Sequence, residues 1–148
     1  MDLTGYTATR ALARATTIPA SWYTDARMLP LEKRRVFQRT WQVVGHACRV
    51  NEPGSYFTAD IAGEPTVVAR AADGELCAFS NVCRHRASLV ASGCGRAGIL
   101  RCPYHGWKFR PDGTCVEIPA SAPDLPVPKR ARVDAYPVEE RYGFVWVF

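Results

Sequence analysis

Two short segments of the chain each hold one cysteine and one histidine, and this pairing limits the possible folds more than any other feature. Box one is Cys83-x-His85, and box two, after sixteen further residues, is Cys102-x-x-His105. The boxes use two of the three histidines in the 148 residues. Cysteines beside histidines commonly bind metal, so the sequence predicts one metal centre held between two loops.

The mixed ligand supply indicates which metal centre this is. Common zinc sites take two cysteines, two to four residues apart, from a single knuckle, and neither box has such a pair. A two-iron cluster with unlike ends fits better, with Cys83 and Cys102 on one iron and His85 and His105 on the other. Two thiolates cancel the formal charge of two ferric ions and two sulfides, so an incoming electron meets little repulsion. Such clusters reach roughly −150 to +300 mV, above the roughly −400 mV of plant-type all-cysteine clusters.

The sequences of the boxes, "CRHR" and "CPYHGW", resemble the two boxes of a Rieske [2Fe-2S] domain. More specifically, they resemble the N-terminal domain of the large subunit of Rieske non-haem iron oxygenases of the aromatic-ring-hydroxylating type. The likeness runs from "SWYTDARMLPLEKRRVFQRTWQVVGH" through "GELCAFSNVCRHRA" to "RYGFVWVF" and covers most of the chain. It implies one [2Fe-2S] cluster per chain.

The residues beside the ligands separate this sequence from the high-potential branch of the family. That branch carries an extra cysteine in each box and a hydroxyl residue after the second His-Gly, whereas this chain has Tyr104 and Trp107 there. With fewer donors to the sulfurs, the reduction potential should fall at the low end of the Rieske range. The flanking residues expected to contact or tune the centre are Arg84, Arg86, Tyr104, Gly106, Trp107 and Lys108.

The resemblance also implies a function and a set of partners. In this family the domain takes single electrons from a flavin reductase or ferredoxin and passes them to a mononuclear Fe(II) that activates oxygen. Two histidines and a carboxylate of a C-terminal catalytic domain hold that iron, and only His46 remains uncommitted here, so this chain alone lacks the oxygen-activating site. A homotrimer with transfer between neighbouring subunits is expected, with either His85 or His105 facing the acceptor.

Two other functions are compatible with cysteine and histidine in these boxes. One is a free-standing Rieske ferredoxin-like electron carrier, which the N-terminal helix and the hydrophobic last segment disfavour. The other is a structural zinc-binding module, which the ligand spacing disfavours. Because the chain stops on "YGFVWVF", we expect it to belong to a longer polypeptide.

The expected fold is mainly β, a small antiparallel barrel or sandwich. Asp73-Gly74 and Asp112-Gly113 are predicted hairpin turns, and residues 119–137, rich in proline, a surface loop. Residues 1–40 are expected to form an arm and one helix that starts at Pro30, and residues 41–148 the Rieske domain. Runs of four to seven apolar and β-branched residues predict strands within 41–47, 55–61, 65–70, 75–81, 98–102, 106–110, 114–118 and 142–148.

Charge and the remaining cysteines complete the expectations. The net charge is +5, and no acidic residue lies between Glu75 and Asp112, so the box region is expected to be electropositive and to attract an acidic redox partner. Neither nucleic acid nor a membrane is an expected partner, and the cytoplasm is the expected compartment. Of the residues outside the boxes, Cys77 and Cys115 are predicted core residues, Cys94 a loop thiol, Cys48 a residue without a role at the centre and His46 a structural residue.

Overall fold

The computed structural model describes residue 6 and residues 11–122 and 124–148, which fall into two compact units, Met1–Arg39 and Thr40–Phe148. None of the helices in that described part has the length and apolar character that crossing a bilayer requires. The described residues of the first unit form four short helical elements: η1 (Leu12–Arg14), α1 (Ala20–Thr24), α2 (Met28–Arg35) and η2 (Phe37–Arg39).

The prediction of one helix starting at Pro30 is wrong. α1 lies where an extended approach was expected, and α2 begins at Met28, two residues before the proline. Asp25 makes the turn between them, because its carboxylate accepts the Arg27 backbone N–H at 2.9 Å and its carbonyl accepts that of Met28 at 2.9 Å. Pro30 is tolerated at the third helical position, since the first four N–H groups of a helix lack partners in any case.

The sequence spacing of Leu31, Phe37 and Trp41 would suit one apolar helical face, but the three residues do not share a helix. α2 ends at Arg35, so Phe37 lies in the separate turn η2. Trp41 belongs to the second unit, where its ring packs against Phe148 with 5.6 Å between ring centroids.

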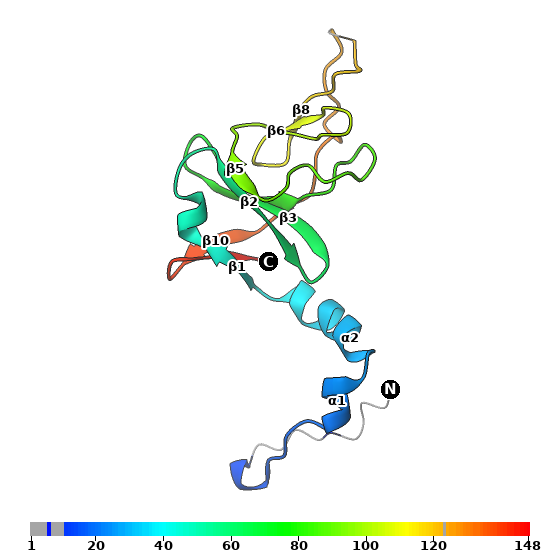
Figure 1. Ribbon diagram of the computed structural model, residues 1–148, viewed down its shortest axis with the longest axis vertical. Coiled ribbons are helices and arrows are strands. Elements are labelled where there is room, and N and C mark those ends of the chain that lie inside the picture. The colour runs from blue at the N-terminus through cyan, green and yellow to red at the C-terminus, as the bar shows by residue number, and fades with distance from the viewer. Residues whose placement is uncertain (1–5, 7–10, 123) are drawn as a thin grey trace. The chain divides into compact units, whose positions relative to one another are not determined.

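The second unit is built from three antiparallel sheets, with η3 (Ala47–Val50) between β1 and β2. One sheet has the order β1-β11-β10, formed by Gln42–His46, Phe144–Val147 and Val138–Arg141. The largest has the order β5-β2-β3-β4-β9, formed by Cys94–Arg96, Ser55–Ile61, Glu64–Arg70, Leu76–Ser80 and Ala135–Tyr136. The third has the order β6-β7-β8, formed by Leu100–Arg101, Lys108–Phe109 and Cys115–Glu117. In Figure 1 the five-stranded sheet lies between the other two.

The predicted mainly antiparallel β fold is confirmed, and each of the eight predicted runs overlaps one strand. The sequence did not indicate β5, β9 or β10. Cys94, expected in a flexible loop, lies in β5, and β9 falls at the end of the predicted loop 119–137. β5 reads Cys-Gly-Arg and is exposed throughout, so it has no hydrophobic alternation and forms because β2 offers it an edge.

The central strand β3 is buried on both faces and divides the apolar interior into two clusters. Val67 points into the cluster that also contains Phe79, Phe109 and both box cysteines, whereas Val68 points into the cluster with Phe57. Side chains of a strand alternate between faces, so neighbouring valines serve opposite cores. The first cluster therefore packs against the two boxes through their cysteines.

The two Asp-Gly pairs form the predicted turns and share one hydrogen-bond pattern. Gly74 and Gly113 have φ of +87° and +81°. The preceding carboxylates of Asp73 and Asp112 accept the N–H of Glu75 and Thr114, at 2.9 and 2.8 Å. Only the second turn is crowded, because an added Cβ would meet the Val133 carbonyl oxygen at 2.8 Å.

Gly113→Ala is expected to destabilise the protein more than Gly74→Ala does. A Cβ at either position costs about 1 kcal/mol of left-handed backbone strain. At Gly74 nothing lies within 4 Å of the added atom, whereas at Gly113 the Val133 backbone must shift. We expect losses of about 1 and about 3 kcal/mol respectively, measured by urea unfolding. Equal losses would contradict a rigid contact at Val133.

Candidate metal centre

Box one lies in a tight loop that is closed by two backbone hydrogen bonds. The Cys83 N–H donates to the Ser88 carbonyl at 2.9 Å, and the Cys83 carbonyl accepts the Ala87 N–H at 2.9 Å. Ala87 has φ of +54°, in the left-handed region that non-glycine residues seldom occupy. The loop thus reverses direction within six residues and leaves His85 at its tip.

Box two forms the same loop. The Cys102 N–H donates to the Trp107 carbonyl at 2.8 Å, and the Cys102 carbonyl accepts the Gly106 N–H at 3.0 Å. Gly106 has φ of +74° and corresponds to Ala87 of box one. The two boxes, which share little sequence, therefore share one backbone design, and their histidines differ in position by one residue within it.

The two loops bring like ligands together. Cys83 and Cys102 belong to one buried cluster and are 2% and 1% exposed, whereas His85 and His105 are exposed and their rings lie 4.4 Å apart between centroids. The sulfurs thus face the core and the imidazoles face solvent. The two loops therefore place the four candidate ligand residues close together, with the cysteines toward the core and the histidines toward solvent.

The surroundings of the site shift the pKa values of Cys83 and His105. Burial raises the pKa of the Cys83 thiol and the adjacent Cys102 raises it further, while the backbone N–H groups of His85 and Arg86, which donate to the Cys83 sulfur, lower it. Desolvation, with the nearby His85 and Arg86, lowers the pKa of His105 and favours the neutral imidazole that binds metal. A bound cation would ionise the thiols outright.

The donor set fits a [2Fe-2S] cluster. Two thiols on one side and two imidazoles on the other match a cluster that takes two protein ligands per iron. Among the residues that the structure describes, no three His, Cys, Asp or Glu side chains are grouped around a single ion position. A cluster with two protein ligands per iron does not require such a group.

Comparison with known proteins identifies the domain. Residues 40–137 match the Rieske [2Fe-2S] domain. The chain belongs to the Rieske [2Fe-2S] domain family. A curated relative, choline monooxygenase of Amaranthus tricolor, is 42% identical over 101 residues, which cover 68% of this chain and 23% of that protein. The benzene 1,2-dioxygenase alpha subunit of Pseudomonas putida is 36% identical over 122 residues, covering 77% and 27%.

A solved structure of a Rieske monooxygenase is also similar to this chain. A quaternary ammonium Rieske monooxygenase, described in relation to carnitine oxidation and inter-subunit electron transfer, superimposes with a TM-score of 0.80 at 33% identity. The match covers 88% of this chain and 36% of that one. This Rieske domain thus holds a [2Fe-2S] cluster, and the chain spans about a quarter of the length of the curated relatives reported above.

Aromatic side chains surround the histidines. The Trp107 ring stacks on His85, with 5.1 Å between centroids and 4° between planes. The Tyr104 ring, 60% exposed, lies 3.9 Å from His105 between centroids. Phe109 is fully buried in the core cluster that also contains Cys83 and Cys102.

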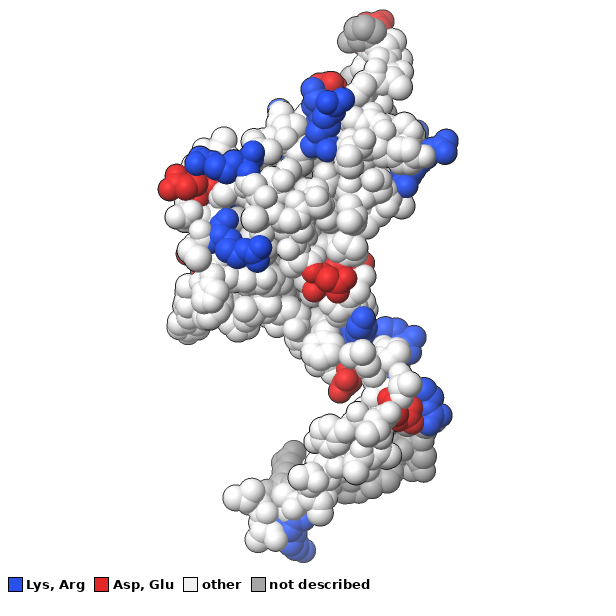
Figure 2. Space-filling view, viewed as in Figure 1, with Lys and Arg blue, Asp and Glu red and all other residues white. Residues whose placement is uncertain are grey.

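The basic residues of the boxes are partly neutralised by acidic residues from outside the acid-free interval. Arg84 pairs with Asp134 at 2.7 Å, and Lys108 pairs with Glu117 at 2.6 Å. Arg86 makes no ion pair with any described residue. In Figure 2, the Lys and Arg side chains of the viewed face lie in separate patches with uncharged surface between them.

Asn81 is a structural residue of the site that sequence reasoning missed. Its side chain is 2% exposed, accepts the N–H groups of Val90 and Ala91 at 3.0 and 2.9 Å, and donates to the Ala91 carbonyl at 2.9 Å. It thereby ties the chain that leaves the box-one loop to the end of β4. A lone asparagine before "VCRHR" carries no signal that distinguishes this role.

Asn81→Leu is expected to destabilise the protein by about 3 kcal/mol. The Ala91 N–H and carbonyl lose their side-chain partner, and the Val90 N–H keeps only the Asn81 backbone carbonyl. Urea unfolding followed by circular dichroism measures the loss. Thr58→Val is the control, since it removes only an exposed hydrogen bond to the Gly93 carbonyl and should cost less than about 1 kcal/mol. Similar losses in the two variants would contradict the role assigned to Asn81.

The remaining cysteines and histidine lie away from the boxes, and all six cysteines are free of disulfides. Cys115 is a core residue as predicted, whereas the same prediction for Cys77 is wrong, because Cys77 is only half-buried. Burial still raises the pKa of the Cys77 thiol to about 11. Cys48 and Cys94 are exposed, and His46, at the end of β1, packs against the Phe144 ring with 4.5 Å between centroids.

Proposed function

We propose that this Rieske domain transfers single electrons through a cluster bound by Cys83 and Cys102 on one iron and by His85 and His105 on the other. The observation that carries the assignment is the pairing of like ligands by two loops of one backbone design. When bound, the cluster supplies reversible uptake of one electron. The chain supplies the rest of the site.

The buried cysteines and the exposed histidines of the two boxes have different roles. The buried cysteines exclude water from the sulfur side, where the N–H groups of His85 and Arg86 meet the Cys83 sulfur. The exposed imidazoles open the other side to solvent and to a partner protein. Trp107, stacked on His85, restricts the rotation of that ring and holds its outer edge in one direction.

The electron donor that we propose is a flavin reductase or a ferredoxin, and the acceptor is a mononuclear non-haem iron in the catalytic domain of a ring-hydroxylating-type oxygenase. The names of the relatives support this, because choline and benzene are chemically unlike and the Rieske domain is what their oxygenases share with this chain. The large subunits would form a homotrimer in which electrons cross between neighbours. Inter-subunit electron transfer in the structurally similar monooxygenase supports that arrangement.

We also propose the cytoplasm as the compartment, because a reducing environment keeps the cluster thiols available.

An anaerobic titration with dithionite tests the function. The protein is expected to take up one electron per chain, to lose its visible colour, and to give the low average g-value paramagnetic signal of a mixed-ligand cluster. A protein that contains iron and sulfide but accepts no electron over the Rieske range of potentials would contradict the proposal.

A further inference from the structure

The two loops share a backbone design, but their flanks are held differently. Box two lies at the tip of the β6–β7 hairpin, where Leu100 pairs with Phe109 and Arg101 with Lys108. Box one follows the end of β4 at Ser80, and its flanks are joined by the isolated bridge between Val82 and Leu89 and by the Asn81 hydrogen bonds described above, with no strand ladder. Box one therefore needs anchors other than a strand ladder.

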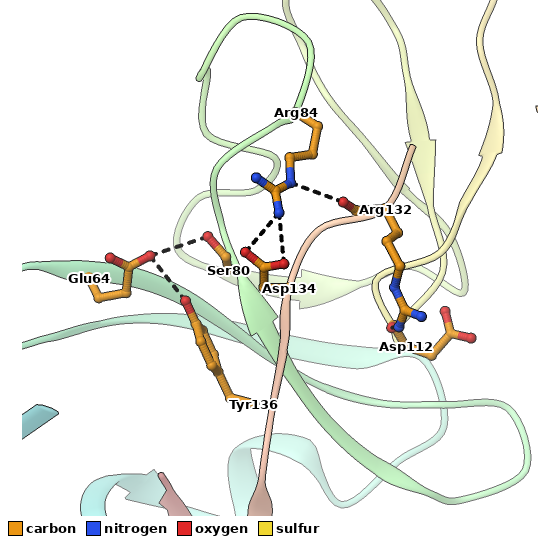
Figure 3. Close-up of polar contacts among 7 residues, drawn as sticks. All are labelled: Glu64, Ser80, Arg84, Asp112, Arg132, Asp134 and Tyr136. Atoms are coloured by element: carbon orange, nitrogen blue, oxygen red, sulfur yellow. Dashed lines mark hydrogen bonds and ion pairs between the residues drawn. The ribbon is translucent and has the colours of Figure 1, made fainter. Parts of the chain in front are cut away.

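The Arg84 side chain supplies such an anchor from inside the box. Its terminal nitrogen donates to both Asp134 carboxylate oxygens, at 2.7 and 2.9 Å, and its Nε donates to the Arg132 carbonyl at 3.2 Å (Figure 3). An arginine held at two nitrogens has a fixed orientation, which a single contact would not give. The guanidinium thus fixes the loop residue that lies between the two ligands.

The segment that receives Arg84 is itself firmly held. The Ser80 N–H donates to the Asp134 carbonyl at 2.8 Å, and the Val133 N–H donates to the Gly113 carbonyl at 2.9 Å. Glu64 joins three strands nearby, because its carboxylate accepts the hydroxyls of Ser80 and Tyr136 at 3.3 and 3.1 Å (Figure 3). The segment that carries Asp134 lies directly before β9 and is therefore hydrogen-bonded to its neighbours on both sides of Asp134.

The residues after Arg84 contribute the N–H groups of His85 and Arg86 that donate to the Cys83 sulfur. We propose that Arg84 is a positioning residue, which through Asp134 and the Arg132 carbonyl holds these two N–H donors on the sulfur of Cys83. The inference rests on the proposed ligand set. Hydrogen bonds to cluster sulfurs raise the reduction potential, so the tether should keep the potential higher than it would otherwise be.

The Arg84–Asp134 ion pair is expected to contribute little to the free energy of unfolding. The side chains of Arg84 and Asp134 are 51% and 65% exposed, and exposed ion pairs add little to the free energy of unfolding. Loss of the pair should therefore leave the urea midpoint nearly unchanged while it loosens the donors at Cys83.

The decisive variant is Asp134→Asn in the cluster-loaded protein. By charge alone, removal of a carboxylate near the cluster raises the midpoint potential, because a reduced cluster carries more negative charge. By positioning, the same variant lowers the midpoint, because the sulfur loses its donors. Glu117→Gln is the matched control, since it removes a carboxylate paired with Lys108 of β7, whose place the β7 ladder fixes.

An EPR-monitored redox titration is expected to show a lower midpoint for Asp134→Asn and a slightly higher midpoint for Glu117→Gln, with both urea midpoints close to that of the parent. Loss of cluster from Asp134→Asn alone, with secondary structure retained, also supports the tether. A raised or unchanged midpoint for Asp134→Asn overturns it. If instead the parent protein binds no iron and sulfide, the proposed function has failed and not the tether alone.

Discussion

Replacing Cys83 with serine is expected to give a folded protein that holds little or no iron. A serine hydroxyl does not supply the thiolate that a ferric–sulfide cluster needs, and one protein ligand of four is lost. The fold should survive, because the serine oxygen can accept the N–H groups of His85 and Arg86 that now reach the sulfur. Iron and acid-labile sulfide per chain, measured after anaerobic purification, should fall by roughly an order of magnitude or more.

Cys115→Ser is the matched control for this loss. Cys115 is 5% exposed and belongs to the same core cluster as Cys83, yet it lies in β8 outside both boxes. The control should keep its iron and sulfide. Equal loss from both variants would mean that a buried cysteine matters for packing alone, and a full complement in Cys83→Ser would remove Cys83 from the ligand set.

His105→Cys is expected to keep a cluster and to lower its reduction potential by on the order of 100 mV or more, toward the range of all-cysteine clusters. The third thiolate makes the oxidised cluster more negative, so an added electron is opposed more strongly. The substituted side chain lies at the exposed edge of the site, where the core imposes no packing demand on it. A redox titration of the anaerobic protein measures the change.

The control for this shift is His46→Cys. His46 lies at the end of β1 and packs on Phe144, away from the two boxes. Its replacement should leave the midpoint potential where it was. An unchanged midpoint in His105→Cys would show that the His105 imidazole is not bound to iron.

The strands that bury side chains could be predicted from sequence, and those that do not could not. "SYFTADI" predicts β2 at its observed bounds because Phe57 and its neighbours alternate between core and surface. β5 and β9 are two or three residues long and largely exposed. They form because β2 and β4 offer unpaired edges, which is a tertiary cause and leaves no local pattern.

The same division holds at the site. The candidate ligand residues could be proposed from sequence because cysteine and histidine in this spacing are chemically distinctive. The anchors could not: Asp134 lies fifty residues from Arg84, in a segment that reads as a proline-rich loop and its exit. Asn81 is close in sequence, but asparagine is common before loops for other reasons. Short sequence motifs reveal which residue types could bind metal, whereas the contacts that orient those residues depend on the fold.

The central claim is that two irons are bound unequally, one by sulfur and one by imidazole. Mössbauer spectroscopy of the oxidised protein, enriched in ⁵⁷Fe, tests this most directly, because the spectrum distinguishes ferric ions by their ligands. Two components of equal area and different isomer shift are predicted. A single component, or an absence of iron from a folded preparation, would contradict the account.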